Sequence, residues 1–341
     1  MKKIYYITAV FATLFLVGCG DGIDLPGVNV ETDLNKIPLP DNNVNLEQVE
    51  LKPSTEPMLH EGLHTEEDFQ RIRDKKAAGE EPWVSAYQLL VESQFSQKTA
   101  DTYPTEWIKR GVSGDENYMN AARGATIAYQ QALRWKIEQD DEYAAKAVEN
   151  LNKWVQTCVG VTGNTNLSLA AGLYGYEFAI AGELLRDYGG WDRADFAAFQ
   201  NWLLKVFYPA NDDFLKRHHD TNALHYWANW CLCNIAAKMA IGIVTDRRDI
   251  YNEGIAHLQT GDTNGRLRRA IYHDYAPDYN FAQWQESGRD QGHTLMCVGL
   301  MGIICQLAWS QGDDFFAYDD NLFLRACEYA ACCNYTNETV P

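Results

Sequence analysis

The sequence predicts an all-α fold of the α/α toroid type, in which helical hairpins are arranged around a ring. Apolar residues recur three and four positions apart, as at Leu300, Ile303, Ile304 and Leu307, which is the spacing of one helix face. Turns such as Tyr188-Gly189-Gly190 separate segments of similar length, and strand-type alternation is scarce. About ten helices joined by short turns favour stacked hairpins over a small bundle. An irregular solenoid is the alternative.

The helices are expected to follow one another from about residue 65. Thr65 can cap a helix whose first turn contains Glu66, Glu67 and Asp68. Further helical patterns cover about 82–95, 117–137, 142–158, 167–187, 193–206, 222–243, 248–258, 265–273, 290–311 and 320–333. The last pattern ends shortly before Pro341, so we expect either a final element beyond the sequence or an incomplete ring.

The amino terminus has the pattern of an export signal. Met1-Lys2-Lys3 is basic, residues from about 4 to 17 are apolar, and the run ends in Leu16-Val17-Gly18-Cys19. The run is too short to span a bilayer comfortably. It resembles bacterial lipoprotein signals, which implies removal of residues 1–18, a lipid on Cys19, and export to the periplasm, outer membrane or cell surface. An ordinary signal peptide with an incidental Cys19 is the alternative.

The rest of the chain divides into a tether and a body. Residues 19–57 are rich in Asp, Asn, Pro and Val without a sustained period, which predicts an extended tether. Residues 58–341 suit one large domain. We expect a monomer whose membrane contact is made by the lipid.

Eight cysteines remain beside Cys19, and most lie among apolar helical residues. This favours small buried side chains over a disulfide framework, although one disulfide from Cys327 to Cys332 or Cys333 stays open. Cys231 and Cys233 would point to opposite sides of a helix, and no second pair has zinc-ligand spacing. We therefore expect no metal and no cofactor.

A cluster of histidines and arginines lies between Arg217 and His293, in a chain whose formal net charge is -18. Such a charge repels anions, so we expect no nucleic-acid partner, and a local basic cluster requires an explanation. Imidazoles, phenols and guanidiniums can remove a proton next to a carboxylate and stabilise the resulting anion. The histidines of the cluster are His218, His219, His225, His257, His273 and His293.

Three strings in this cluster carry a specific resemblance. They are His218 to Trp230 with its Trp-Ala-Asn-Trp end, Arg266-Leu267-Arg268-Arg269-Ala270-Ile271-Tyr272-His273, and Glu286-Ser287-Gly288-Arg289-Asp290-Gln291-Gly292-His293. Together with His60-Glu61-Gly62-Leu63-His64, they resemble the alginate-lyase-like polysaccharide lyases, closest to lyase family 38, over about residues 58 to 333. The resemblance implies an α/α toroid that cleaves alginate or glucuronan, an anionic polysaccharide partner, by β-elimination.

This reaction on a 4-linked uronate has three requirements. The uronate carboxylate must be neutralised or strongly hydrogen-bonded, because the C5 proton is otherwise hardly acidic. A base must remove that proton, and an acid must protonate the O4 leaving group. Asn, Gln, Arg and His suit the first task, and a tyrosine can serve as acid and base if cations lower its pKa from about 10.

Tyr272 is our candidate for the acid, because the resemblance implies a tyrosine in this Arg-rich segment. A helix over 265–273 would place Arg268 and Arg269 beside it. Arg266 is expected to bind the substrate. The alternative is a tyrosine whose ring belongs to the core and whose hydroxyl has a partner.

His218, His219 and His225 are candidates for the base or the neutralising group, with Asn222 as a carboxylate ligand. Related lyases have an Asn-His pair at this helix start, next to a tryptophan. His218 or His219 corresponds to the histidine of that pair if the loop before the helix forms the site. His225 corresponds to it if the position is counted from the tryptophan. Each histidine could instead pack a helix end, and Asn222 could cap the helix.

Arg289 and His293 would share one face of a helix that follows Gly288, and there they would bind the substrate carboxylate. Gln291 is a further candidate for carboxylate binding. The alternative for Arg289 is an internal ion pair with Glu286 or Asp290. The tryptophans that could stack on sugar rings are Trp227, Trp230 and Trp284, although a place in the helical core is the more usual use of this residue.

Two other functional classes stay open. A glycoside hydrolase on the same fold would need two carboxylic acids around the glycosidic bond. The available acids are Asp220, Asp274, Glu286 and Asp290. A non-catalytic glycan-binding lipoprotein would explain the lipid and the tryptophans, but gives no reason for a Tyr-Arg-His cluster.

Overall fold

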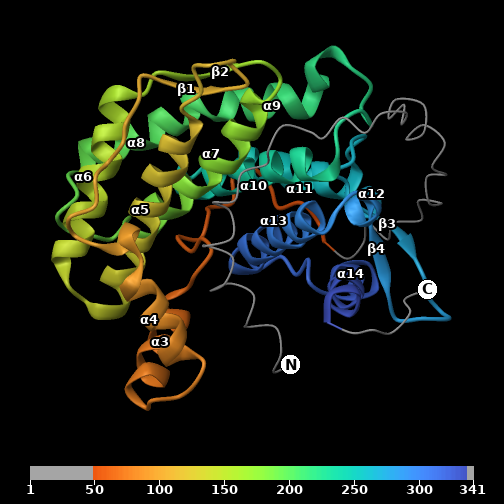
Figure 1. Cartoon of the computed structure of the whole chain (residues 1–341), viewed down its shortest axis with the longest axis horizontal. Coiled ribbons are helices and arrows are strands. Elements are labelled where there is room, and N and C mark those ends of the chain that lie inside the picture. Colours follow the sequence, from red (N-terminus) through yellow and green to blue (C-terminus); the bar gives the residue numbers. More distant parts are fainter. Residues whose placement is uncertain (1–48, 336–341) are drawn as a thin grey trace.

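The computed structural model describes residues 49–335, which form the predicted helical toroid (Figure 1). The predicted signal segment 1–18, Cys19 and the tether up to residue 48 lie outside the described residues, as do residues 336–341. The longer helices are α3 (Glu66–Ala77), α4 (Trp83–Glu92), α5 (Tyr118–Glu138), α6 (Asp141–Thr157), α7 (Leu167–Leu184), α8 (Arg193–Val206), α9 (Tyr208–Arg217), α10 (Ala228–Val244), α11 (Arg248–Thr260), α13 (Gln291–Ser310) and α14 (Tyr318–Tyr335).

Four helices form the inner layer of the ring, in the order α5, α7, α10 and α13. They run parallel, because their amino ends meet at one end of the molecule and their carboxyl ends at the other. Asn234 Nδ2 of α10 donates to the carbonyl of Ser168 at the start of α7 (3.2 Å), while Arg186 after α7 donates to the last carbonyl of α10 (2.9 Å). All of α10 except Trp230 is buried, which explains its apolar residues on every side.

The outer layer consists of α6, α8, α11 and α14, which pack against the inner helices or each other. These helices are amphipathic, as in α6, where Ala144, Ala147, Leu151 and Trp154 face inward at spacings of three and four. Side-chain caps fix the first turns of several helices, among them α3, α6 and α8. The capping box predicted at Thr65 is present, with Asp68 as the reciprocal partner.

α13 is the one helix among residues 49–335 that is long and apolar enough to cross a membrane by length and composition. More than half of the apolar window is buried inside the protein. Its composition is therefore accounted for by its place in the inner layer of the ring.

Two small sheets interrupt the helices. β1 (Trp107–Arg110) and β2 (Gly160–Gly163) are parallel, and β3 (Ile271–Asp274) and β4 (Ala282–Trp284) form an antiparallel hairpin. The short helix α12 (Leu267–Ala270) leads directly into β3. The hairpin packs against α14.

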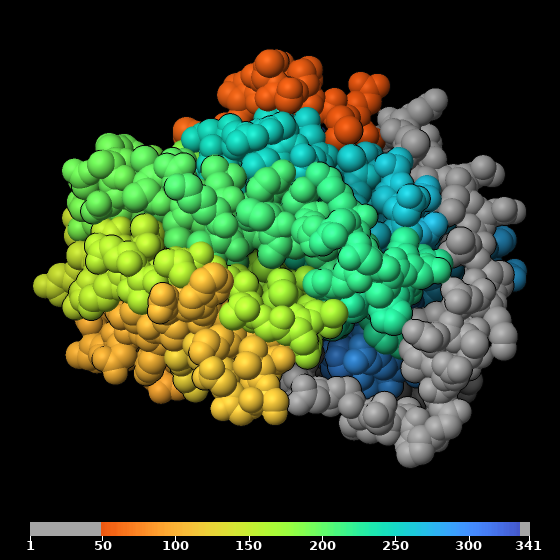
Figure 2. All heavy atoms as spheres, turned by 90° about the horizontal axis from the view of Figure 1, so that it is seen from above, coloured from red at the N-terminus to blue at the C-terminus, as the bar shows by residue number. Residues whose placement is uncertain are grey.

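Residues 49–64, which we call the N-terminal strap, bind along the outside of α11 and then cross the carboxyl ends of the inner helices. Gln259 and Asn252 of α11 donate to the carbonyls of Val49 (2.8 Å) and Lys52 (2.6 Å). In Figure 2 the orange atoms of this segment lie on the cyan surface around residue 250. Residues 49–57, which the sequence assigned to the tether, thus contact the body.

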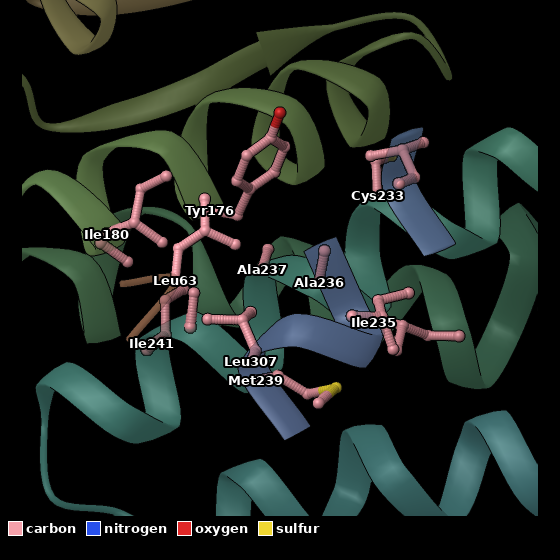
Figure 3. Close-up of a cluster of buried hydrophobic side chains, with 14 of the residues drawn as sticks. Leu63, Tyr176, Ile180, Cys233, Ile235, Ala236, Ala237, Met239, Ile241 and Leu307 are labelled. Atoms are coloured by element: carbon pink, nitrogen blue, oxygen red, sulfur yellow. The ribbon is translucent and has the colours of Figure 1, made fainter. Parts of the chain in front are cut away.

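The strap ends inside the ring. Figure 3 shows Leu63 among Ile180 of α7, Ile241 of α10 and Leu307 of α13. The Gln311 amide, just after α13, donates to the carbonyls at positions 59 (2.9 Å) and 61 (2.7 Å). The strap therefore covers one end of the inner helices, and their amino ends lie at the opposite end.

Candidate active site

The amino ends of three inner helices meet at one irregular segment, residues 218–227, which we call the histidine loop. Ser168 Oγ at the start of α7 hydrogen-bonds His219 Nε2 (2.9 Å). The Arg289 guanidinium, two residues before α13, lies over the Trp227 ring at 5.2 Å. The loop itself leads into α10. Because the amino end of a helix carries partial positive charge, this end of the toroid favours an anion.

The helix predicted from residue 222 begins at Ala228 instead. The residues from His218 to Asp220 have positive φ angles of 48° to 58°, which ends α9 and prevents continuation of the helix. Asn264 Nδ2 then holds the loop by donating to the carbonyls of Leu224 (3.0 Å) and Tyr226 (2.8 Å). The sequence could not show this contact, which comes from residues far along the chain.

The structure separates the three candidate histidines. His218 is 2% exposed, packs on Phe214 and lies 3.6 Å from Cys231 Sγ. Burial, together with the neighbouring His219 and His225, lowers the pKa of His218 to about 4. It is thus a buried neutral imidazole. His219 is half-buried beside Ser168, and His225 is exposed with its ring edge against Tyr226 (4.9 Å).

Asn222 is exposed, and its side-chain oxygen accepts a hydrogen bond from the Leu224 N–H (2.8 Å). The residue therefore closes a turn within the histidine loop rather than capping α10. Instead, two side-chain oxygens from η6 (Gln285–Gly288) accept from the first N–H groups of α10. Gln285 Oε1 accepts from the Ala228 N–H, and Glu286 Oε1 accepts from the Asn229 N–H (both 2.9 Å).

Tyr272 lies on a strand, so the helix predicted over 265–273 is wrong beyond Ala270. Ile271 pairs with Trp284 and His273 with Gln283, which leaves Tyr272 as the extra residue of a β-bulge. Bulges commonly redirect a side chain next to an active site. Burial, with Tyr275 nearby, raises the pKa of Tyr272. The expected lowering by Arg268 and Arg269 is therefore absent, and the phenol keeps its proton at neutral pH.

The three arginines around α12 have different partners. Arg268 pairs with Asp319 and donates to Asp274 (3.1 Å), which is also bound by Arg325. These contacts fasten the hairpin to α14. Arg266 has no carboxylate within ion-pair distance among residues 49–335, and its buried Nε has no hydrogen-bond partner. Arg266 is therefore a guanidinium with unused binding capacity.

Arg289 and His293 do not share one helix, contrary to the prediction. Arg289 lies before α13, whose N-cap is Asp290. The Arg289 Nη1 donates to the fully buried Glu286 carboxylate (3.1 Å). His293 Nδ1 lies 2.6 Å from Asp290 Oδ2. The internal ion pair considered for Arg289 is thus present. Gln291 is exposed at the first position of α13.

The tryptophans also separate by burial. Trp284 is fully buried and donates to the Ala326 carbonyl (3.0 Å), so it belongs to the core. Trp230 is half-buried against Tyr226, with ring centroids 4.7 Å apart. Trp227 is half-buried under Arg289. Trp227 is therefore the tryptophan that lies beside the polar groups of the site.

The cysteines between positions 158 and 333 are thiols, and five of them are buried, as predicted. Cys327, Cys332 and Cys333 form no disulfide with one another. Over residues 49–335, no three side chains of His, Cys, Asp or Glu are grouped as a metal site.

A model of the alginate lyase family matches residues 72–338. The chain belongs to this family. It is therefore a polysaccharide lyase, and the resemblance inferred from its three strings is confirmed at the family level. None of the curated proteins matches the sequence.

Solved structures of other alginate lyases share the fold of this lyase. Alginate lyase A1-III from Sphingomonas species A1 is 13% identical, with a TM-score of 0.56 over 81% of this chain and 80% of its own. A histidine-to-alanine variant of A1-III complexed with tetrasaccharide is 14% identical, with a TM-score of 0.61 over 83% and 82%. An alginate lyase from Bacteroides ovatus is 14% identical, with a TM-score of 0.57 over 79% and 82%.

Several residues that shape the site of this lyase were not predicted from sequence. Ser168 contacts His219, Asn264 holds the histidine loop, and Glu286 joins the starts of α10 and α13. No local signal marks Ser168 or Asn264. Glu286 belongs to a string that the sequence singled out, but its complete burial is a property of the fold.

Proposed function

We propose that this lyase cleaves a 1,4-linked uronate polymer by β-elimination, with mannuronate-rich alginate as the preferred substrate and glucuronan next. The proposal also places it in the family 38 branch. One observation carries it: His219 and His225 lie in the histidine loop at the amino ends of the inner helices, and the segment that Asn264 ties to this loop continues with Arg266 and the protonated Tyr272. Arg266 has no carboxylate within ion-pair distance among residues 49–335. The tetrasaccharide complex of A1-III agrees with a substrate of this class.

In the proposed reaction, Tyr272 is the acid. Its phenol retains its proton because burial raises its pKa. His219 or His225 takes the C5 proton, and the C5–H electrons form the C4–C5 double bond. The C4–O4 bond breaks, and O4 receives the phenolic proton. No water is consumed, so the new non-reducing end is an unsaturated uronate.

The carboxylate beside C5 is bound by Arg266, with Asn222 as a second donor. A guanidinium can donate two parallel hydrogen bonds to a carboxylate and stabilise the charge that develops on it as the proton leaves C5. Arg289 already donates to Glu286, and we assign it to holding Trp227 and the histidine loop. His293 and Gln291, at the start of α13, remain candidates for contacts with neighbouring sugar hydroxyls.

Replacement of Tyr272 by Phe tests the acid. We expect Tyr272→Phe to abolish formation of unsaturated uronate from polymannuronate, measured by its ultraviolet absorbance, without changing the unfolding temperature. Tyr275→Phe is the matched control, because Tyr275 follows the same strand and its hydroxyl donates to Gln283 (2.9 Å). Near-full activity of Tyr272→Phe would show that the acid is another residue.

Separate Gln variants of His219 and His225 identify the base. The variant of the base should lose at least about a hundredfold in kcat, in line with the usual contribution of a general base, and the other should not. An equal and small effect of both would place the base elsewhere. The same assay over polymannuronate, polyguluronate, glucuronan and glycosaminoglycans tests the substrate.

Two of the four acids available to a hydrolase, Asp274 and Glu286, are unsuited to that role, which disfavours this alternative. Asp274 is bound by Arg268 and Arg325, and its pKa is lowered by the Arg325 contact despite partial burial. Glu286 is fully buried and therefore out of reach of a sugar. A saturated reducing sugar as the product, without ultraviolet absorbance, would reverse this conclusion.

We also propose that the lyase is an exported lipoprotein with the lipid on Cys19. The signal pattern of residues 1–19 supports this proposal. Metabolic labelling with palmitate should mark the wild type and not Cys19→Ala, and the variant should appear in the soluble fraction. Equal labelling of both proteins would exclude Cys19 as the acceptor.

A further inference from the structure

A buried serine holds the ring of one of the two histidines proposed as the base. Ser168 Oγ, in the first turn of α7, lies 2.9 Å from His219 Nε2, and Ser168 is 1% exposed. The rings of Phe214 and Tyr226 lie against the same imidazole, with centroids 5.6 Å and 5.8 Å away. His225, in contrast, is exposed, and its side chain makes no hydrogen bond within residues 49–335. A general base must be held in one orientation, and of the two histidines His219 meets this requirement.

The Ser168 hydroxyl is a rigid point of the fold. The Ser168 carbonyl accepts from Asn234 Nδ2 of α10 (3.2 Å), and the Ser168 N–H donates to the Thr165 carbonyl (3.1 Å). Asn234 is fully buried and accepts from Asn211 Nδ2 of α9 (2.7 Å). Contacts from α9 and α10 therefore fix the serine that meets His219.

The backbone at His219 has an unfavourable conformation. His218, His219 and Asp220 have φ angles of 48°, 51° and 58°, where residues other than glycine are strained. Such strain persists only when the surroundings enforce it, and it is concentrated at functional sites. The Thr221 N–H closes the turn by donating to the His218 carbonyl (3.1 Å), and Ser168 holds the His219 side chain from α7. The strained turn thus keeps the His219 ring facing Ser168.

The contact with Ser168 decides which ring nitrogen of His219 a substrate can meet. Nε2 faces the buried hydroxyl, whereas Nδ1 makes no hydrogen bond to any residue that the structure describes. A neutral imidazole carries its proton on one nitrogen and a lone pair on the other, and the partner of one nitrogen fixes this choice. A serine hydroxyl can accept or donate. If Ser168 accepts, the proton is on Nε2 and the lone pair is on Nδ1, away from the buried serine.

We propose that Ser168 is a positioning residue, which accepts the Nε2–H of His219 and thereby presents the Nδ1 lone pair as the base. The assignment rests on the proposed function. Nδ1 takes the C5 proton, the C5–H electron pair forms the C4–C5 double bond, and O4 leaves with the Tyr272 proton. The imidazolium keeps its Nε2–H on Ser168. Transfer of the Nδ1 proton through solvent to the Tyr272 phenolate restores both groups.

The first test compares Ser168→Ala with Ser310→Ala. Ser310 is also a buried serine of an inner helix, but it lies at the carboxyl end of α13, where its hydroxyl donates to the Gln306 carbonyl (3.1 Å). Each variant loses one neutral hydrogen bond, so both should lower the unfolding temperature by about 1–6 °C. On polymannuronate, Ser168→Ala should lower kcat about 10- to 100-fold, as for other groups that orient a functional histidine, and change KM less than about threefold. Ser310→Ala should keep the wild-type kcat.

A double-mutant cycle and nitrogen NMR separate positioning from a structural role. In a His219→Gln background, Ser168→Ala should change kcat less than about twofold, because the hydroxyl acts through the imidazole. In spectra of the histidine-labelled protein, neutral His219, assigned by its loss in His219→Gln, should carry its proton on Nε2. Ser168→Ala should shift this ring toward a mixture of both tautomers. A wild-type proton on Nδ1, or an equal effect of Ser168→Ala in both backgrounds, would overturn the proposal. If His219→Gln is too slow to compare, the tautomer decides.

The outcomes also distinguish this inference from the proposed function. If the wild type releases no unsaturated uronate from any uronan, the proposed function fails, whereas the NMR spectra still test the contact with Ser168. If the wild type is active and Ser168→Ala has the kcat of Ser310→Ala, the function stands and the inference fails. A large loss of kcat in His225→Gln, with none in His219→Gln, has the same meaning.

Discussion

Glu286 joins the starts of two inner helices, and its replacement by Gln should measure how strongly this junction stabilises the lyase. Its carboxylate accepts from the Asn229 N–H (2.9 Å) and Cys297 Sγ (3.3 Å) on Oε1, and from Arg289 Nη1 (3.1 Å) on Oε2. A glutamine has one acceptor oxygen and one amide group. If the oxygen keeps the Oε1 contacts, the amide faces Arg289, and two donors oppose each other.

The expected cost follows from the lost contact. A hydrogen bond to a charged group contributes about 1.5–3 kcal/mol, and a buried opposed donor adds to the loss. We therefore expect Glu286→Gln to lower the free energy of unfolding by about 2–3 kcal/mol. For a domain of this size, each 1 kcal/mol lowers the unfolding temperature by about 2–4 °C, so the decrease should be about 4–12 °C.

Urea unfolding and calorimetry of a double-mutant cycle test this reasoning. The cycle contains Glu286→Gln, Arg289→Met and the double variant, in which no charge is left unpaired. The two effects should not add, because each single change breaks the same ion pair. Additive effects, or a decrease in the unfolding temperature below about 1 °C for Glu286→Gln, would refute the role assigned to this carboxylate.

Two further predictions concern pH and metal. Burial lowers the pKa of His64, His218 and His257 from 6.5 to about 4, so the unfolded chain binds more protons between these values. The contribution of these three neutral histidines to the free energy of unfolding is therefore fully present above pH 6.5, and it is lost as the pH drops toward 4. His257→Gln should reduce the slope of unfolding free energy against pH in urea titrations, whereas a slope equal to that of the wild type would contradict the pKa assignment. Because no three ligands are grouped as a metal site over residues 49–335, EDTA should leave elimination on polymannuronate unchanged, and loss of activity that calcium restores would disprove this.

The sequence predicted the long helices well, because their signals are local. α8 has the predicted bounds, and the Asp192 side chain caps its first turn by accepting from the Ala194 N–H (2.7 Å). In contrast, α9 was not predicted. It starts immediately after α8 with Pro209 in its first turn, and no turn residue separates the two helices.

The segment around Tyr272 was mispredicted for a different reason. Arg268, Arg269 and Ala270 are good helix formers, and they do form one turn. The next residues pair with β4 instead, and the bulge depends on the register between Ile271 and Trp284, thirteen positions away. Such pairing reflects packing against α14 rather than a local preference. The residue with the proposed acid role was identified, but its geometry was not.

The arginines show what a charge pattern in a sequence leaves open. Arg266, Arg268, Arg269 and Arg289 look alike in the two basic strings. Arg266 and Arg289 were expected to bind the uronate, and Arg268 and Arg269 to lie beside Tyr272. The carboxylate that neutralises Arg268 comes from Asp319, 51 positions away, and the one that neutralises Arg289 is buried between two helices. An arginine held by an acid stabilises the fold, and its loss leaves a buried charge unpaired. Arg266 and Arg269 have no carboxylate within ion-pair distance among residues 49–335, and the Nε of each is buried without a hydrogen-bond partner. Stability measurements on arginine variants should therefore separate Arg268 and Arg289, whose loss lowers the unfolding temperature, from Arg266 and Arg269, whose loss breaks no such ion pair.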